Sequence, residues 1–146
     1  MNQQLIDLKN KLSPIAGLIE DKNDVFYLDY PLHLNVGDLL IYHGTEQFFV
    51  DHGINVTLKR SEFDMDLTEI KRKITPNTTI LLHGGGNFGD LYPQHQNLRE
   101  TIVQAFPNNR VIVLPQTLYY KSQETLEKSA ALFMQHNDCH LLARDE

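Results

Sequence analysis

The stretch Thr79-Ile80-Leu81-Leu82-His83-Gly84-Gly85-Gly86-Asn87-Phe88-Gly89-Asp90 decides the fold class. Its first four residues form a short apolar and β-branched run, which is typical of a strand buried on both faces. The eight residues that follow include four glycines, so they predict that the strand ends in a loop. A helical pattern comes next, since Leu98, Ile102 and Phe106 recur at four-residue steps. A strand, a loop and a helix in this order indicate one βα unit of a parallel sheet.

The same unit recurs along the chain. Short apolar runs predict strands, and amphipathic segments between them predict helices. The predicted strands cover residues 25–28, 54–58, 79–82, 110–114 and 140–143, and the predicted helices cover about 35–53, 66–74, the segment closed by Pro107, and 123–136. We therefore predict a single domain, residues 1–146, with an α/β fold. It consists of a mainly parallel sheet of about five strands, covered by helices on both faces to give three layers.

Local signals mark the ends of several helices. Residues 1–22 form a helical segment, and Ser13 followed by Pro14 predicts the N-cap and first turn of a second short helix within it. Gly53 is expected to end the helix of 35–53 in the left-handed conformation. Asp66 with Glu69 three residues later predicts a variant of the capping box.

Two unusual loops indicate the order of the strands. Residues 35–38, Asn-Val-Gly-Asp, follow the first strand, and residues 83–90 follow the third. Ligands of open α/β sheets bind beyond the carboxyl ends of the strands, where neighbouring connections leave for opposite faces. The order 2-1-3-4-5 places both loops on one crevice, so we favour it. The alternative order 3-2-1-4-5 would separate them.

The composition excludes several classes of protein. Of the 146 residues, 41% are hydrophobic and 22% charged, as in ordinary globular domains. The net charge of −6 argues against a nucleic-acid partner, because such binding is led by basic contacts to phosphate. Cys139 is the single cysteine, so no internal disulfide and no cysteine zinc site are expected. No apolar run approaches the roughly 18 residues of a transmembrane segment, and we expect a cytoplasmic protein.

The triple glycine is the sharpest candidate for a ligand-binding element. Gly84, Gly85 and Gly86 let the backbone adopt positive φ and let a ligand approach the N–H groups. Consecutive N–H groups near a helix N-terminus form a nest for an anion. The structural alternative is a tight turn without a ligand. Four glycines within six residues at the end of a strand favour the functional interpretation.

The loop after the first strand has two interpretations of equal weight. Asn35 and Asp38 are residue types that cap helices, which needs no ligand. Gly37 between them favours a close approach of the backbone, and therefore the positioning of a substrate.

Further candidates follow the third, fourth and fifth strands. His95 and Arg99 are four residues apart, so they share one face of the next helix, and Arg99 there offers a fork to a carboxylate or phosphate. His83 is expected to be a structural histidine satisfied by a backbone carbonyl. Gln116, in the predicted turn after the fourth strand, and Arg144, after the fifth, are expected to face the same crevice.

Several familiar sites are absent from the sequence. No GxGxxG motif follows the first strand, and no P-loop or GxSxG motif is present. The seven histidines lack spacings typical of metal ligands, so we predict no metal and no cofactor.

These loops resemble those of the polysaccharide pyruvyl transferases. The resemblance rests on residues 35–38, 82–92, 96, 99, 113–117 and 143–145. It implies two Rossmann-like domains that face each other, as in the GT-B glycosyltransferases. It also implies that this chain is the N-terminal half of a longer protein and is inactive by itself. In agreement, the sequence stops directly after the fifth predicted strand.

The resemblance implies transfer of pyruvate from phosphoenolpyruvate to two hydroxyls of a sugar, as a ketal, in exopolysaccharide or cell-surface polysaccharide synthesis. The acceptor is a saccharide or a lipid-linked saccharide, and the donor is a substrate rather than a cofactor. Asp38, Asp90 or His95 is implied to carry the proton or to position the acceptor sugar. The implied substrate-binding residues are Asn35, Gly37, Gly84, Gly85, Gly86, Asn87, Arg99, Gln116 and Arg144. Two alternatives stay open: half of a GT-B glycosyltransferase, and a non-catalytic flavodoxin-like binding module.

Overall fold

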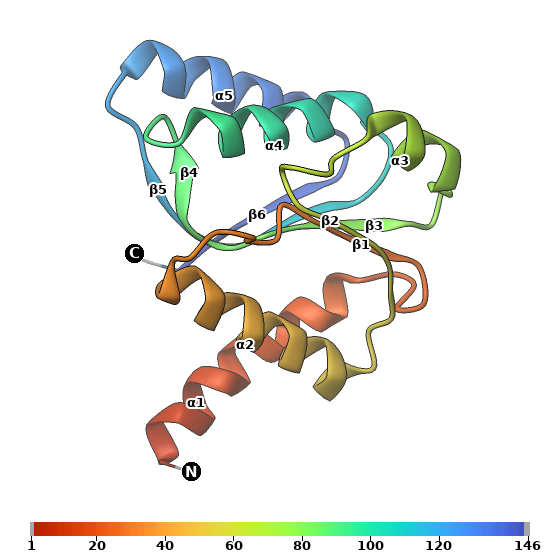
Figure 1. Cartoon of the computed structure of the whole chain (residues 1–146), viewed down its shortest axis with the longest axis vertical. Helices are drawn as coiled ribbons and strands as arrows, with labels where there is room; N and C mark the ends of the chain where they lie inside the picture. Colours follow the sequence, from red (N-terminus) through yellow and green to blue (C-terminus); the bar gives the residue numbers. More distant parts are fainter. Residues whose placement is uncertain (1, 145–146) are drawn as a thin grey trace.

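The computed structural model describes residues 2–144 of the chain. The helices are α1 (Gln3–Leu12), the 3-10 helix η1 (Ser13–Leu18), α2 (Val36–His52), α3 (Leu67–Lys73), α4 (Pro93–Ala105) and α5 (Gln123–Gln135). The strands are β1 (Val25–Leu28), β2 (Val56–Arg60), β3 (Thr79–Leu82), β4 (Gly85–Gly89), β5 (Val111–Tyr119) and β6 (Cys139–Ala143). Helices α3, α4 and α5 cover one face of the sheet, and α1 and α2 lie on the other (Figure 1). The predicted three-layer α/β fold is confirmed.

The sheet is parallel throughout. Strand β1 pairs with β2 on one side and β3 on the other, β3 pairs with β5, and β5 pairs with β6. The five predicted strands therefore follow the favoured order 2-1-3-4-5, and the alternative 3-2-1-4-5 is wrong. The second strand lies at Val56–Arg60, slightly later than the predicted 54–58.

The predicted glycine loop is a sixth strand. Gly85–Gly89 forms β4, which pairs with the second half of β5 through Gly85 opposite Gln116 and Gly89 opposite Tyr119. Strands β3 and β4 thus run one after the other along the same edge of β5. Because β5 continues to Tyr119, Gln116 lies within a strand and not in the predicted turn.

The helix ends agree with their sequence signals at three positions out of five. Gly53 ends α2 with φ of 64°, and Asp66 caps α3 by accepting a hydrogen bond from the Thr68 N–H at 2.8 Å. Asn35 is the N-cap of α2. Ser13 makes no side-chain cap of η1, and Glu69 pairs with Arg60 at 2.7 Å instead of completing a capping box.

Two hydrophobic cores lie on the two faces of the sheet, because successive residues of a strand point to opposite sides. In β1, Phe26 and Leu28 join the core under α3, α4 and α5, whereas Val25 and Tyr27 join the core against α2 and η1. Burial on both faces explains why β1 and β3 consist of apolar residues without alternation.

Helix α1 extends away from the sheet (Figure 1). None of its residues is buried, and Leu5, Leu8 and Leu12 are exposed along it. Within residues 2–144, no helix combines the length and the apolar character that a membrane span requires.

Candidate functional site

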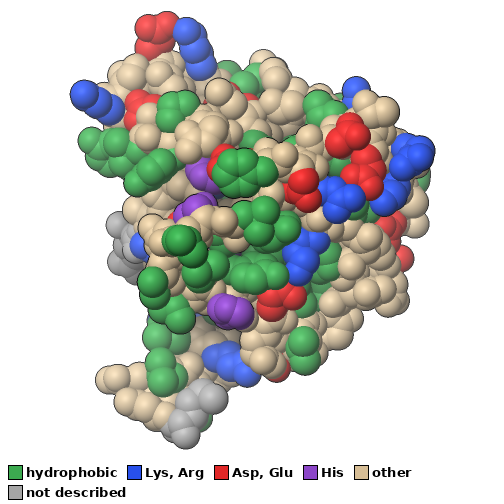
Figure 2. Space-filling view, viewed as in Figure 1, with side chains coloured by type: hydrophobic (Ala, Val, Ile, Leu, Met, Phe, Trp, Pro, Cys, Tyr) green, Lys and Arg blue, Asp and Glu red, His purple; other side chains and the backbone are tan. Residues whose placement is uncertain are grey.

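A polar cavity of about 390 Å³ lies at the carboxyl ends of β1 and β3. It is lined by His33, Asn35, Asp38, Glu62, Gly86, Asn87, Tyr92, Gln94 and His95. The loop after the first strand and the glycine segment therefore meet in one hollow, as predicted. In the space-filling view, two histidine side chains reach the surface close together (Figure 2).

The start of α2 places Asn35 and Asp38 in this cavity. The Asn35 side chain accepts a hydrogen bond from the Asp38 N–H at 3.2 Å, which makes Asn35 the N-cap of α2. Asp38 Oδ2 lies 2.6 Å from Nε2 of His33, a residue that the sequence did not point to. Capping and lining of the cavity thus coexist at Asn35. Gly37 is exposed beside them and is not among the lining residues.

Glycine is required at the positions of this motif for different structural reasons. A Cβ at Gly84 would lie 2.7 Å from the Pro115 carbonyl oxygen, and a Cβ at Gly89 would overlap the Tyr119 carbonyl. These two positions need glycine because the backbone of β5 is close, and not because of a ligand. Gly85 needs it because its φ is 125°.

Gly86 is the one of these four glycines with open space at its Cβ position. Apart from Gly86 itself and its two chain neighbours, no described residue has a heavy atom within 4 Å of its Cβ position, and Gly86 lines the polar cavity. The predicted anion nest over Gly84–Gly86 is therefore replaced by a strand in which Gly86, next to Asn87, presents an uncovered backbone to the cavity.

His95 is held at the start of α4 by a carboxylate. Its Nδ1 lies 2.8 Å from Asp29 Oδ1, and Glu62 Oε2 is 3.7 Å from the same nitrogen. The hydrogen bond with Asp29 raises the pKa of His95, against the opposing effect of burial. The sequence predicted His95 but missed Asp29 as its partner, because Asp29 precedes it by 66 residues.

Arg99 corrects a predicted substrate ligand. Its side chain is fully buried, and burial lowers the pKa of the guanidinium to about 10. It donates to the Asn87 carbonyl oxygen at 3.0 Å, to the Asn87 side chain, and to Gln96 Oε1 at 3.4 Å. Arg99 does not line the cavity, so it positions Asn87 instead of offering its fork to a ligand.

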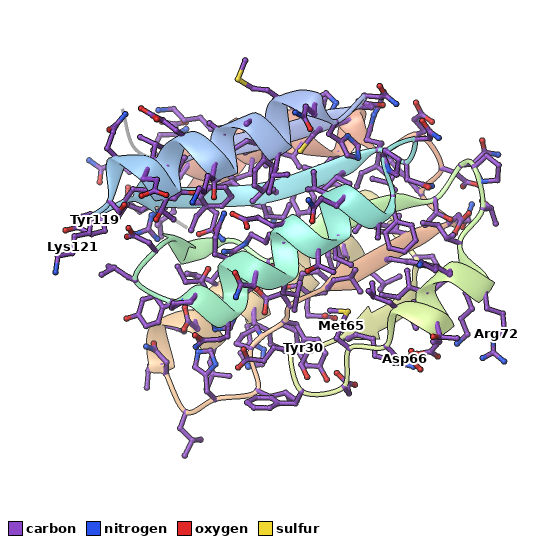
Figure 3. The ribbon with its side chains drawn as sticks, turned by 90° about the horizontal axis from the view of Figure 1, so that it is seen from above. Tyr30, Met65, Asp66, Arg72, Tyr119 and Lys121 are labelled. Atoms are coloured by element: carbon purple, nitrogen blue, oxygen red, sulfur yellow. The ribbon has the colours of Figure 1, made fainter. Side chains whose placement is uncertain are left out.

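Gln116 and Asp90 also have structural roles that differ from the predictions. Gln116 is buried in β5 and donates from Nε2 to the His83 carbonyl oxygen at 2.7 Å. Asp90 accepts hydrogen bonds from the N–H groups of Lys121 at 2.8 Å and Ser122 at 2.8 Å, which lower its pKa. Figure 3 shows Lys121 beside Tyr119 at one end of the molecule. Asp90 thus holds the segment that follows β5 through hydrogen bonds, and it does not line the polar cavity.

His83 is structural, as predicted, but its partner is different. It is buried, and its Nδ1 lies 2.5 Å from the Tyr27 hydroxyl and not beside a backbone carbonyl. Burial lowers the pKa of His83 to about 4, so the imidazole is neutral.

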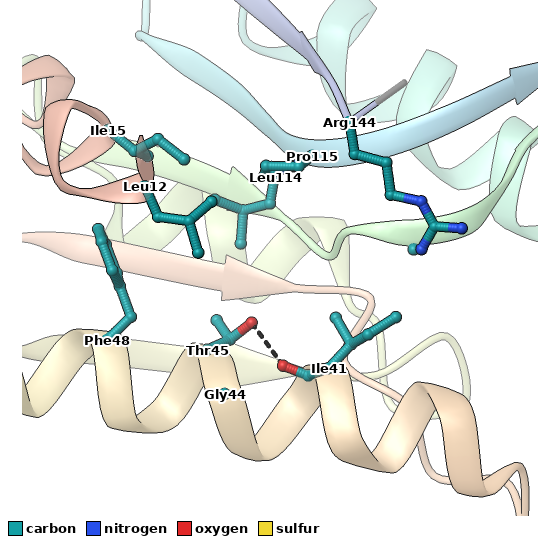
Figure 4. Close-up of a pocket in the computed structure, with 10 residues that line it drawn as sticks. Leu12, Ile15, Ile41, Gly44, Thr45, Phe48, Leu114, Pro115 and Arg144 are labelled. Carbon is teal, nitrogen blue, oxygen red and sulfur yellow. Dashed lines mark hydrogen bonds between the residues drawn. The ribbon is translucent and has the colours of Figure 1, made fainter. Parts of the chain in front are cut away.

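Arg144 lies at a second, apolar cavity of about 340 Å³. Figure 4 shows Leu12 and Leu114 reaching into the gap between the sheet and α2, with Thr45 and Ile41 on the opposite side. Gly85 lines this cavity, whereas Gly86 lines the polar one. The prediction that Arg144 faces the same crevice as Asn35 is therefore wrong. Residue 145, part of the resemblance above, lies outside the described residues.

The side chains that line the polar cavity can transfer protons and form hydrogen bonds. Two histidines and two carboxylates, His33, His95, Asp38 and Glu62, line one cavity with amide side chains between them. Within residues 2–144, no three His, Cys, Asp or Glu side chains are grouped as ligands of a metal ion would be.

Comparison with known proteins identifies the family of the chain. The family model described as polysaccharide pyruvyl transferase matches residues 35–146, which begin at Asn35 and include the whole glycine segment. The chain belongs to the polysaccharide pyruvyl transferase family. Within this family, it is 44% identical over 142 residues to EpsO of Bacillus subtilis, named as a candidate pyruvyl transferase. It is 36% identical over 126 residues to pyruvyl transferase 1 of Schizosaccharomyces pombe.

The chain spans less than half the length of these relatives. The match to EpsO covers 97% of this chain and 43% of the relative, and the match to the yeast protein covers 83% and 31%. A crystal structure of an uncharacterized Klebsiella pneumoniae protein aligns with a TM-score of 0.56 at 15% identity. That alignment covers 98% of this chain and 56% of the other, and it supports the fold alone.

Proposed function

We propose that the full product of the gene transfers the pyruvyl group of phosphoenolpyruvate to two hydroxyls of a saccharide, forming a cyclic ketal. The observation that carries this proposal is the polar cavity in which His95, His33 and Asp38 meet beside Gly86. Membership of the pyruvyl transferase family supports it. We further propose that the product belongs to an exopolysaccharide or cell-surface polysaccharide, and that the protein acts in the cytoplasm.

The reaction needs an acid within reach of the methylene carbon of the donor and a base within reach of the attacking sugar hydroxyl. A proton added to the methylene carbon of the enol makes the neighbouring carbon electrophilic, and a sugar hydroxyl attacks it with loss of a proton. The C–O bond to phosphate then breaks, inorganic phosphate leaves, and the second hydroxyl closes the ring with loss of another proton. The net change is phosphoenolpyruvate plus a diol giving ketal plus phosphate.

The cavity residues fit these roles. His95 is our candidate for the acid, because its Nδ1 is bound to Asp29 while Nε2 makes no hydrogen bond within residues 2–144. Asp38, paired with His33 at 2.6 Å, is our candidate for receiving the proton of a sugar hydroxyl. Asn35, Asn87 and the Gly86 backbone supply uncharged hydrogen-bonding groups for the acceptor.

The charge of the cavity suggests where the donor is held. Among the described residues that line it, none is a lysine or an arginine, although phosphoenolpyruvate carries a phosphate and a carboxylate. We therefore propose that a second domain supplies the cations for the donor and that this domain binds the acceptor. More than half of each curated relative reported above lies outside its match to this chain. On this proposal the 146-residue chain alone is inactive.

The test is an assay of the full gene product with phosphoenolpyruvate and saccharide or lipid-linked saccharide acceptors. We expect release of phosphate together with an acceptor whose mass has grown by that of the pyruvyl ketal. Thermal-shift measurements with phosphoenolpyruvate and with nucleotide sugars serve as the discriminating control. Stabilisation by nucleotide sugars alone, without phosphate release, would favour the glycosyltransferase alternative and contradict the proposal.

A further inference from the structure

Asp29 occupies an unusual position directly after β1. Among the described residues it is the single non-glycine residue with positive φ, at 64°. It is 2% exposed, although an aspartate is seldom fully buried unless it is paired. A left-handed conformation and a buried charge each cost free energy, so the surrounding structure must hold this carboxylate in place. Such positions are concentrated at functional sites.

The contacts of Asp29 are directed to α4. Its Oδ1 lies 2.8 Å from His95 Nδ1, and its Oδ2 lies 3.6 Å from Arg99 Nη2. Oδ2 makes no hydrogen bond to any described residue. The carboxylate therefore has one short contact, and that contact is with the imidazole that lines the polar cavity.

We propose that Asp29 is a positioning residue that orients the His95 imidazole and holds it protonated, so that Nε2–H is presented to the substrate in the cavity. This inference rests on the proposed function and assigns the group behind its acid. A carboxylate behind a histidine fixes both the tautomer and the ring orientation, as in other carboxylate–histidine pairs. Asp29 itself does not line the cavity.

The charges around His95 support the protonated form. Asp29 from the end of β1 and Glu62 from the segment after β2 face the ring and favour the imidazolium. Arg99, on the same helix, opposes it. His33 lies across the cavity with its ring centroid 6.1 Å away, and His83 is neutral because of its burial. The two carboxylates prevail, since the pKa of His95 lies above its ordinary value of 6.5.

A carboxylate–histidine pair outside the polar cavity, Asp138 with His140, provides a control. Asp138 Oδ1 lies 2.9 Å from His140 Nε2, close to the distance in the Asp29–His95 pair. Both side chains of that pair are 34% exposed, and neither lines the polar cavity. Asp138→Asn therefore removes a similar contact without touching the proposed site.

The first experiment titrates the histidines of the 146-residue chain by NMR with labelled imidazole nitrogens, and His95→Gln assigns the signal of His95. Asparagine tolerates positive φ, so Asp29→Asn preserves the backbone and the size of the side chain. We expect the His95 midpoint to fall by at least one pH unit in Asp29→Asn and to stay unchanged in Asp138→Asn. An unchanged midpoint in Asp29→Asn would overturn the proposal. So would a midpoint at or below 6.5 in the unmodified chain, a measurement that needs no variant to fold.

The second experiment measures phosphate release by the full gene product over a range of pH. We expect Asp29→Asn to move the alkaline limb of kcat at least one pH unit toward acid, with KM for the acceptor changed less than about twofold. A uniform loss of activity at every pH would show a merely structural role and overturn the proposal. If the unmodified protein releases no phosphate, the proposed function fails, while the NMR titration still decides the state of His95.

Discussion

Two buried histidines at the same end of the sheet have pKa values shifted in opposite directions. His83 follows β3, contacts the Tyr27 hydroxyl at 2.5 Å and belongs to the side of the sheet covered by α2. His95 begins α4 and contacts Asp29 at 2.8 Å. Burial lowers the pKa of His83 to about 4, whereas the carboxylate raises that of His95.

The comparison shows that the partner, and not burial alone, sets the state of a histidine. A phenol hydroxyl accommodates a neutral imidazole, and a buried carboxylate stabilises an imidazolium. The imidazole beside the polar cavity therefore binds a proton more readily than an ordinary histidine, and the imidazole of His83 binds one less readily.

The largest expected effect is the difference in enzyme activity between variants of the two histidines. In the full gene product, His95→Gln should lower kcat for phosphate release by a hundredfold to ten-thousandfold, the usual contribution of a general acid. His83→Gln should keep kcat within about threefold, because glutamine can still accept a hydrogen bond from Tyr27. Phosphate release at saturating substrate is the measurement. Equal losses in the two variants, with both folded by circular dichroism, would contradict this difference between the two histidines.

The next effect is on stability and follows from His83. Its pKa is about 4 in the fold and about 6.5 in the unfolded chain, so the unfolded chain binds more protons between these values. The stabilisation from a neutral His83 is fully present above pH 6.5 and is lost as the pH falls toward 4. We expect a loss of about 2 to 3 kcal/mol of unfolding free energy over this interval.

Denaturant unfolding of the 146-residue chain at several pH values measures how the unfolding free energy changes with pH. His83→Gln should reduce the fall in unfolding free energy between pH 6.5 and 4. Asp29→Asn should change the pH dependence of the unfolding free energy on the alkaline side of this range. The stabilisation that comes from the raised pKa of His95 is present below pH 6.5 and is lost as the pH rises through the raised value. A fall toward acid pH that His83→Gln leaves unchanged would show that other groups cause it.

The sequence predicted the fold better than the chemistry of the site. The order of the strands followed from two loops that had to meet, and Asn35 and Gly86 do line one cavity. Strand β4 was missed because glycine disfavours strands by propensity, and here the close backbone of β5 overrides that preference. Local signals therefore identified the site but misjudged the conformation of its glycine segment.

The roles of Arg99 and Asp29 depend on contacts that no local pattern contains. An arginine one helical turn after His95 suggests an exposed fork, yet Arg99 lies in the middle of α4, is fully buried and donates to Asn87 of β4. Asp29 had one visible signal, its position directly after a buried strand. Its importance arises from His95, which the fold brings close from a distant part of the sequence.

The smallest expected effect compares the two cavities on either side of β4. Gly86 lines the polar cavity and Gly44 of α2 lines the apolar one, and a Cβ at either position meets open space within the described structure. Neither glycine has positive φ, so alanine strains neither backbone. Gly86→Ala should raise KM for the acceptor about tenfold with little change in melting temperature, because the methyl group occupies part of the site. Gly44→Ala should leave KM unchanged and raise the unfolding free energy by about 0.5 to 1 kcal/mol, since alanine is favoured within a helix. Steady-state kinetics and denaturant unfolding of both variants decide the matter: a rise in KM confined to Gly44→Ala would place the acceptor in the apolar cavity and remove His95 from the reaction.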